Sequence, residues 1–269
     1  IALLSSLVEN LPEDVAIRLV ARGILPLCGV PEAIEAIGVA ATVGRDLLEY
    51  DPLLLPIDEA PASAVLSEAV SKQALSAFGV CVPQSERVED MNALGDASSK
   101  VGFPVVLKGV GFAHKTEAAA LALNLQSVPE VLDAAEKMPS SQFLLEQMIT
   151  GAVAELLVGV VHDPAHGFVL TVAAGGVLTE LLSDRVSVLV PSDAAAVEAA
   201  LRQLKIFAVL DGYRGNAPAD LNAIVDAVLA IQSYVVAHQP LEVEVNPLLC
   251  LPQGAVAADA LIIEGTSHD

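Results

Sequence analysis

Between residues 65 and 262, short apolar runs of strand length alternate with amphipathic segments of helical spacing. The first helical segment ends at Gly79, a residue type that commonly closes helices. Another opens with Ser127 as a favourable N-cap and has Pro129 in its first turn. Helices patterned in this way bury their apolar faces on sheets, so the alternation predicts layers of helix and strand.

The predicted elements form one module of two successive lobes, residues 61–145 and residues 146–269. Helices are predicted at 65–79, 91–102, 127–138, 194–204 and 222–238. Strands are predicted at 80–88, 103–109, 121–125, 143–149, 154–163, 167–176, 186–191, 241–251 and 254–262. The fold class is therefore an α+β two-lobe module in which strands are concentrated in the second lobe.

The first 60 residues have a different character. Residues 8–22 and 30–47 carry helical patterns, and the apolar stretch 23–29 between them predicts a short buried strand. Residues 48–63 contain three prolines and no periodicity, which indicates a linker. The α/β unit is too short to close its own sheet, so residues 1–60 are predicted to be the end of an α/β domain plus a linker.

Composition narrows the class of function. Apolar residues make up 54% of the chain, which is enough for a sizeable core, and the net charge of -21 argues against a sequence-independent nucleic-acid binder. Cys28, Cys81 and Cys250 are scattered, give no disulfide framework or zinc spacing, and are expected to be small buried residues in a reducing cytoplasm. No uncharged apolar run reaches the about 18 residues of a membrane span, and no signal peptide is apparent.

One loop gathers basic side chains in a chain that has few of them. Lys108 ends the apolar run "VVLK", and a buried ammonium needs an anionic partner, either a carboxylate or a ligand phosphate, unless it extends out to water. Gly109 and Gly111 allow close backbone approach, and His114 and Lys115 follow. The spacing is neither that of a P-loop nor that of a dinucleotide-binding turn, but the group is suited to cradling a polyphosphate.

A second group of polar residues lies near the C-terminal end. Glu242, Glu244 and Asn246 alternate on one face of a predicted strand, and Asp259 lies inside the apolar run of the next strand. Oxygen ligands of this kind suit Mg²⁺, which commonly bridges nucleotide phosphates. The alternative is a buried aspartate bonded to a backbone amide beside a solvated strand face. Together with the Lys108 loop, the group favours ATP-dependent phosphoryl transfer.

Several stretches carry a family resemblance. They read "LSEAVSKQALSAFGVCVP", "GFPVVLKGVGFAHKTE", "LLEQMITGAVAELLVGVVHDPAHGF", "AAGGVLTELLSDRVSVLVP", "DGYRGNAPADLNAIVDAV" and "LEVEVNPLL" before "GAVAADALI". From about residue 62 to 264 the chain resembles the ATP-grasp domain of ADP-forming acyl-CoA synthetases, relatives of the succinyl-CoA synthetase β subunit. Residues 1 to about 50 resemble the end of the flavodoxin-type, succinyl-CoA-ligase-like domain that precedes the ATP-grasp part in fused synthetases.

The resemblance implies an acid–thiol ligase. Such enzymes interconvert acid, CoA and ATP with acyl-CoA, ADP and phosphate, through an acyl phosphate and a phosphorylated histidine. The implied cofactors are ATP or ADP and Mg²⁺, and the implied partners are a small carboxylic acid and CoA. CoA and the main phosphohistidine are expected on a domain outside this chain. We expect a cytoplasmic protein, either a homo-oligomer or an assembly with a CoA-binding domain, that contacts neither membrane nor nucleic acid.

The resemblance also assigns roles to residues. His114, with Lys115, matches a second phosphate carrier, Lys108 matches a lysine that contacts nucleotide phosphates, and Glu155 lies in a further matching motif. The segment that binds adenine is matched by Glu146, Gln147 and Met148. The Mg²⁺ ligands are matched by Asn246 and Asp259, with Glu244 nearby.

One departure from the family pattern follows the His-Lys pair. Many relatives have two glycines and a lysine where this chain has Ala119, Ala120 and Ala122. Alanine allows less backbone freedom than glycine, so the loop is expected to be stiffer and the mobile-carrier role of His114 to be affected most. Two alternatives to the ligase follow: a regulatory ATP-grasp module of a protein lysine acetyltransferase, and an inactive interaction module that binds no nucleotide.

Overall fold

The computed structural model describes residues 1–46, 54, 62–111, 119–176 and 183–266. The chain divides into two compact units, Ile1–Pro52 and Leu53–Asp269, and each is described by itself.

The first unit is a small α/β arrangement. Strands β1 (Ala2–Ser5) and β2 (Leu25–Cys28) pair in parallel. The connection contains the one-turn 3₁₀ helix η1 (Val8–Asn10) and helix α1 (Glu13–Val20), as a parallel pair requires a crossover, and α2 (Val30–Asp46) follows β2. The predicted order of helix, strand and helix is present, and β1 is an additional strand that the helical patterns did not indicate.

The second unit is built on two antiparallel sheets. The larger sheet contains β3 (Ala62–Val65), β8 (Ala154–Asp163), β9 (Gly167–Ala174), β10 (Arg185–Leu189), β11 (Glu242–Cys250), β12 (Ala255–Ala257) and β13 (Ala260–Thr266). Its strands run in the order β10-β9-β8-β11-β13-β3, and β12 pairs with β11. Alternate residues of β8, among them Leu156, Val158 and Val160, are buried, as expected for a sheet that is covered by helices on one face.

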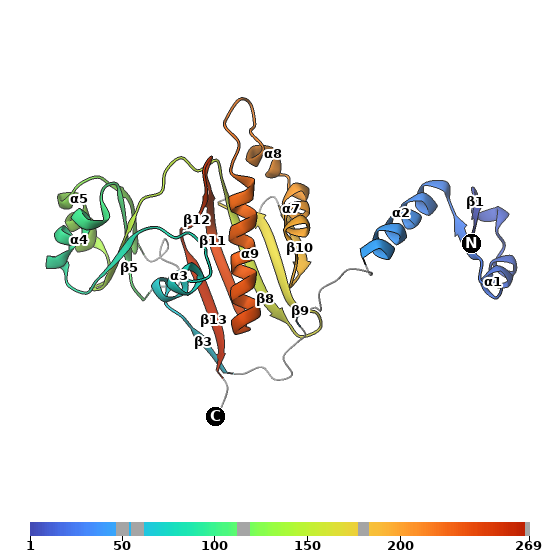
Figure 1. The fold of residues 1–269 in the computed structure, drawn as a ribbon, viewed down its shortest axis with the longest axis horizontal. Coiled ribbons are helices and arrows are strands. Elements are labelled where there is room, and N and C mark those ends of the chain that lie inside the picture. Colours follow the sequence, from blue (N-terminus) through green and yellow to red (C-terminus); the bar gives the residue numbers. More distant parts are fainter. Residues whose placement is uncertain (47–53, 55–61, 112–118, 177–182, 267–269) are drawn as a thin grey trace. The chain divides into compact units, whose positions relative to one another are not determined.

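Helices α7 (Ala194–Gln203), α8 (Phe207–Leu210) and α9 (Leu221–His238) pack with the larger sheet, and α9 runs along it (Figure 1). The side chains of Asp193 and Asp220 cap α7 and α9 by accepting from backbone N–H groups at 2.7 and 3.1 Å. Within the described residues, α9 alone is long and apolar enough to cross a membrane. Half of it is buried against the core, as is common for a central helix of a globular domain.

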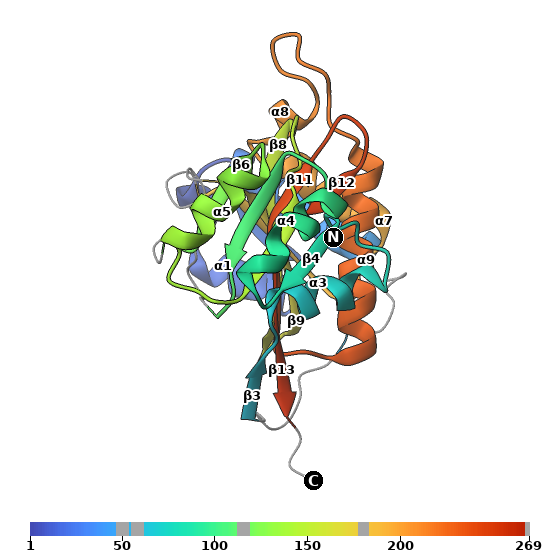
Figure 2. The ribbon, with the colours of Figure 1, turned by 90° about the vertical axis from the view of Figure 1, so that its left-hand side faces the viewer.

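The smaller sheet has the order β4-β7-β5-β6. Its strands are β4 (Ser85–Val88), β5 (Val105–Gly109), β6 (Leu121–Leu125) and β7 (Phe143–Gln147). The 3₁₀ turn η2 (Met91–Ala93) leads into α4 (Leu94–Val101), and α5 (Val128–Lys137) lies beside α4 over this sheet (Figure 2). A separate apolar core, which includes Leu94, Leu107 and Phe143, fills the space between them.

The division between the lobes differs from the predicted one at the start of the unit. Strand β3 pairs with β13 in the larger sheet, and α3 (Glu68–Ser76) follows it. Leu75 of α3 and Val80 after it are buried in the core of the larger lobe, so the first elements of the second unit belong to this lobe. The larger lobe thus comprises β3, α3 and the described elements from β8 onward, and the smaller lobe is inserted between α3 and β8.

The cysteines differ in their burial. Cys250 is buried, which raises the pKa of its thiol to about 12, with the charge of Glu155 as a smaller cause. Cys28 is partly buried, Cys81 is exposed, and all three are free thiols. The expectation of buried cysteines was therefore right for Cys250 and wrong for Cys81.

Candidate nucleotide site

A single cleft of about 1750 Å³ collects the described site residues of the second unit. Strands β5 and β7 of the smaller lobe contribute to its lining, as do β11 and the start of β13 in the larger lobe. The predicted site residues along it are Lys108, Glu146, Gln147, Met148, Glu155, Glu244, Asn246 and Asp259. His114 and Lys115 lie outside the described residues.

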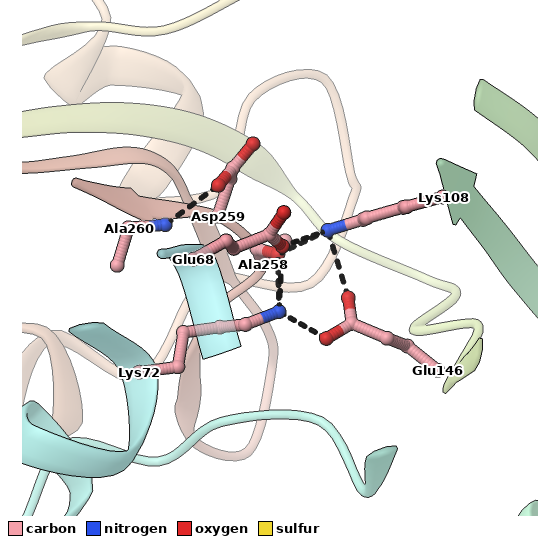
Figure 3. A network of polar contacts seen from close by, with 7 residues as sticks. All are labelled: Glu68, Lys72, Lys108, Glu146, Ala258, Asp259 and Ala260. Atoms are coloured by element: carbon pink, nitrogen blue, oxygen red, sulfur yellow. Dashed lines mark hydrogen bonds and ion pairs between the residues drawn. The ribbon is translucent and has the colours of Figure 1, made fainter. Parts of the chain in front are cut away.

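Lys108 is buried at the end of β5 and reaches toward the larger lobe (Figure 3). Its Nζ lies 2.5 Å from Oε1 of Glu68 and 2.7 Å from Oε2 of Glu146, and it donates to the backbone oxygen of Ala258 at 2.9 Å. The expectation that this lysine needs an anionic partner is confirmed, because two carboxylates supply the negative charge.

Lys72 completes a closed ring of alternating charges. Its Nζ lies 2.8 Å from Oε1 of Glu68, forms an ion pair with Glu146, and donates to Ala258 O at 3.3 Å. We call Glu68, Lys72, Lys108 and Glu146 the charge ring. Each carboxylate in it contacts both lysines, as Figure 3 shows.

Sequence reasoning missed Glu68 and Lys72. Both lie on α3, four residues apart, and therefore on one face of the helix. The same face carries Leu75, which is fully buried. Glu68 and Lys72 have the i, i+4 spacing of an exposed ion pair, yet they share a helix face with the apolar residue Leu75. This combination in the sequence could have indicated a buried ion pair.

The ring keeps Lys108 protonated. Burial, the largest single effect, would lower the pKa of this ammonium. The negative charges of Glu146, Glu68 and Asp259, in that order, act in the opposite direction and raise the pKa of Lys108 above its ordinary value. The cleft therefore has a permanent cation at this position at neutral pH.

Glu146 lines the cleft, and its carboxylate is engaged in the charge ring. Its side chain is 2% exposed, and its carboxylate is bound by both lysines. The backbone N–H groups of Gln147 and Met148 donate to Gln84 O and Pro104 O, each at 2.9 Å. Gln147 and Met148 line the cleft beside Glu146.

Hydrogen bonds connect Glu244 and Asn246 of β11 with Asp259, which lies between β12 and β13. Nδ2 of Asn246 donates to Oε1 of Glu244 at 3.2 Å, and Asn246 N donates to Asp259 O at 3.2 Å. The register of β11 with β8 shifts between Val245 and Leu248, an irregularity that re-aims side chains at this point. Glu244 and Asn246 thus come close to Asp259.

Asp259 is not inside a strand, because the predicted strand 254–262 is divided into β12 and β13 and Asp259 lies between them. It is partly exposed, and its Oδ1 accepts from Ala260 N at 2.8 Å. The backbone amide considered as its alternative partner is therefore present, and the residue still lines the cleft.

The oxygen atoms of Glu244, Asn246 and Asp259 are of the type that Mg²⁺ prefers as ligands. Across the described parts of the chain, no three His, Cys, Asp or Glu side chains come together as a metal cage. Mg²⁺ rarely uses such a cage, since it is usually held by one or two carboxylates, water and substrate phosphates. Asp259 and Glu244, with the amide oxygen of Asn246, would provide ligands of that type on one wall of the cleft.

Two backbone positions near the cleft are tightly restricted. A Cβ at Gly175 would lie 2.8 Å from the backbone carbon of Glu155, and Gly175 N donates to Glu155 O at 2.7 Å. Only glycine allows this approach, which fixes the start of β8 beside the end of β9. Ala119 has a φ of +53°, in the left-handed region that glycine adopts most readily.

Two antiparallel lobes with a charged cleft between them define the class to which this unit belongs. The family model described as the ATP-grasp domain matches residues 59–263, and the chain belongs to this family.

Among curated relatives, trans-feruloyl-CoA synthase from an unknown prokaryotic organism is 32% identical over 237 residues, which cover 81% of this chain and 33% of the relative. The ADP-forming acetate–CoA ligase II of Archaeoglobus fulgidus is 30% identical over 206 residues, which cover 75% of this chain and 30% of the relative. The β subunit of the Pyrococcus furiosus ADP-forming acetate–CoA ligase II is 27% identical, with 76% and 93% covered. The chain thus spans about a third of the first two relatives and most of the third.

Solved structures give the same result. A Korarchaeum cryptofilum acetyl-coenzyme A synthetase in complex with coenzyme A and Mg-AMPPCP has a TM-score of 0.68 and 29% identity, and covers 74% of this chain and 92% of its own. The same enzyme with coenzyme A and Ca-AMPCP has a TM-score of 0.69 and 27% identity, with 74% and 93% covered. The ATP-grasp fold of the second unit is therefore shown, and none of these relatives favours the acetyltransferase-type alternative.

Proposed function

We propose that this chain is the nucleotide-binding, phosphoryl-transferring part of an ADP-forming acyl-CoA synthetase. The observation that carries the proposal is the convergence of eight predicted site residues, from both lobes, on one cleft. The named relatives support it, because they are a feruloyl-CoA synthase, two acetate–CoA ligases and an acetyl-CoA synthetase, and the structure of the synthetase holds a Mg²⁺-nucleotide analogue.

Within the cleft, Lys108 would neutralise nucleotide phosphate oxygens, and Gln147 and Met148 would contact the base. Asp259, Asn246 and Glu244 would hold Mg²⁺, which when bound would neutralise negative charge on the nucleotide. His114 and Lys115 keep their predicted role in carrying the phosphoryl group.

The complete reaction needs more than this unit. In the proposed scheme, acid, CoA and ATP are interconverted with acyl-CoA, ADP and phosphate through an acyl phosphate and a phosphohistidine. The CoA site and the main phosphohistidine belong to a further domain or subunit, and residues 1–60 would be the end of a flavodoxin-type domain. The proposed setting is cytoplasmic, as a homo-oligomer or an assembly with the CoA-binding part.

The charges along the cleft predict that nucleotide binding depends on a divalent cation. Among the described lining residues there are five carboxylates and two cations, Arg87 and Lys108. An ADP or ATP molecule adds further negative charge, so binding without Mg²⁺ is opposed by repulsion at short range.

The test is calorimetric titration of the chain with ADP and ATP, with and without Mg²⁺. Lys108→Met and Asp259→Ala are each expected to weaken Mg²⁺-nucleotide binding at least about tenfold, or about 1.4 kcal/mol. Asp133 and Lys137 form an exposed ion pair on α5, so Lys137→Met and Asp133→Ala serve as matched controls with unchanged binding. A folded wild-type chain that binds no nucleotide would refute the proposal.

A further inference from the structure

Three of the four residues of the charge ring line the cleft, and the fourth, Lys72, does not. Glu68, Lys108 and Glu146 all line the cleft. Lys72 is not among the lining residues, and its side chain is 4% exposed. Lys72 therefore lies behind the two carboxylates, with Lys108 on their cleft side.

The ring also joins the two lobes. Glu68 and Lys72 come from α3 of the larger lobe, whereas Lys108 and Glu146 come from β5 and β7 of the smaller lobe. Both lysines donate to the carbonyl of Ala258, the residue directly before Asp259. The position of Lys108 is thus fixed relative to the segment that carries the proposed Mg²⁺ ligand.

The formal charges within the ring cancel, because two glutamates face two lysines. Without the charge of Lys72, Lys108 would be the only cation between two buried carboxylates and would be held by both. An approaching phosphate would then meet an excess of negative charge. With Lys72 behind them, both carboxylates keep a partner when Lys108 exchanges one of its contacts for a phosphate oxygen.

We propose that Lys72 is a positioning residue: it neutralises Glu68 and Glu146 from behind, which leaves Lys108 able to bind a nucleotide phosphate. The inference rests on the proposed function, since it assumes that the cleft binds a nucleotide. It concerns charge balance, so it predicts that a lost cation can be compensated by removing a carboxylate.

The experiment measures the affinity for Mg-ADP by calorimetry in four variants of the full chain. Lys72→Met is expected to weaken binding about tenfold, and Glu68→Gln to tighten it about threefold. The double variant Lys72→Met/Glu68→Gln, in which the ring charge is again zero, is expected to return to within about threefold of wild type. Lys72→Arg keeps the charge and is also expected to remain within about threefold. Lys137→Met is the control for an exposed lysine.

Rescue by the double variant separates charge balance from a purely structural role, because a variant that only loosens the fold would not regain affinity when a second ring contact is removed. Thermal unfolding of each variant verifies that it is folded, and if Lys72→Met alone does not fold, the double and Arg variants decide. Wild-type affinity in Lys72→Met, or no recovery in a folded double variant, would overturn the inference and leave the proposed function intact. Absence of Mg-ADP binding by the wild-type chain would overturn both.

Discussion

The core of the larger lobe and the charge ring are both buried, but the core consists of apolar side chains and the ring of charged ones. The core is aliphatic and aromatic, with Phe168, Leu170 and Val243 at 0–1% exposure. The ring places four formal charges at the junction of the lobes. Apolar burial stabilises whatever fits the space, whereas buried ion pairs recover little more than their desolvation cost. The core therefore accounts for stability, and the ring is better explained by what it does to the cleft.

The largest expected effect is the loss of unfolding free energy on substitution of a residue in the core of the larger lobe. Phe168 in β9 is 1% exposed, so Phe168→Ala is expected to cost about 3–5 kcal/mol of unfolding free energy. Urea unfolding followed by circular dichroism measures it. Val161 lies on the neighbouring strand β8, is 44% exposed and provides the control. Val161→Ala is expected to cost less than about 1 kcal/mol of unfolding free energy. Equal losses for the two variants would mean that the core is not where stability resides.

The second prediction separates stability from function within the ring. Glu146→Ala leaves two buried lysines with one carboxylate and is expected to cost about 3 kcal/mol. Replacing all four ring residues by methionine removes every charge at similar side-chain volume and is expected to leave stability unchanged or about 1 kcal/mol higher. The same fourfold variant is expected to lose Mg-ADP binding. If it unfolds as readily as Glu146→Ala, the ring itself stabilises the fold and the comparison fails.

The smallest effect concerns pH. Because the folded-state pKa of Lys108 is raised, its contribution to stability is fully present below the unfolded value of about 10.4 and is lost as pH rises toward the folded value. Between pH 7 and 9, wild type and Lys108→Met should show parallel stability. Above pH 10.5, wild type is expected to lose stability faster, by at most about 1.4 kcal/mol per pH unit. Denaturant unfolding at a series of pH values measures the difference, and parallel curves up to pH 12 would contradict the expected role of the ring.

Local pattern predicted most of the elements, because helix and strand periodicity reports which face of a segment is apolar. Strand 154–163 was predicted with the bounds that β8 has, and helix 222–238 differs from α9 by one residue. The strand 254–262 was predicted as continuous because all of it except Asp259 is apolar or small. The structure divides it at Ala258 and Asp259, where Ala260 N donates to the side chain of Asp259. β3 was missed because residues 48–63 looked like a linker, and pairing with β13 is what orders its strand.

The candidate site was predictable where the chemistry of a single position was informative. Lys108 at the end of an apolar strand required an anion, and Glu244 and Asn246 required a polar environment on one strand face. The identity of the anion was not predictable, since Glu68 is 40 residues from Lys108 in the sequence. The pairing of Lys72 with Glu146 was not predictable either, because 74 residues separate them.

The sequence by itself therefore determined most of the elements, the presence of two α+β lobes and the residues that need polar partners, because these follow from side-chain chemistry and short-range periodicity. The tertiary structure alone decided that α3 joins the larger lobe, that Lys72 lies behind Glu68 and Glu146, and that Ala258 accepts from both lysines across as many as 186 residues. Such pairings depend on which surfaces meet when the lobes pack, and no local pattern encodes them.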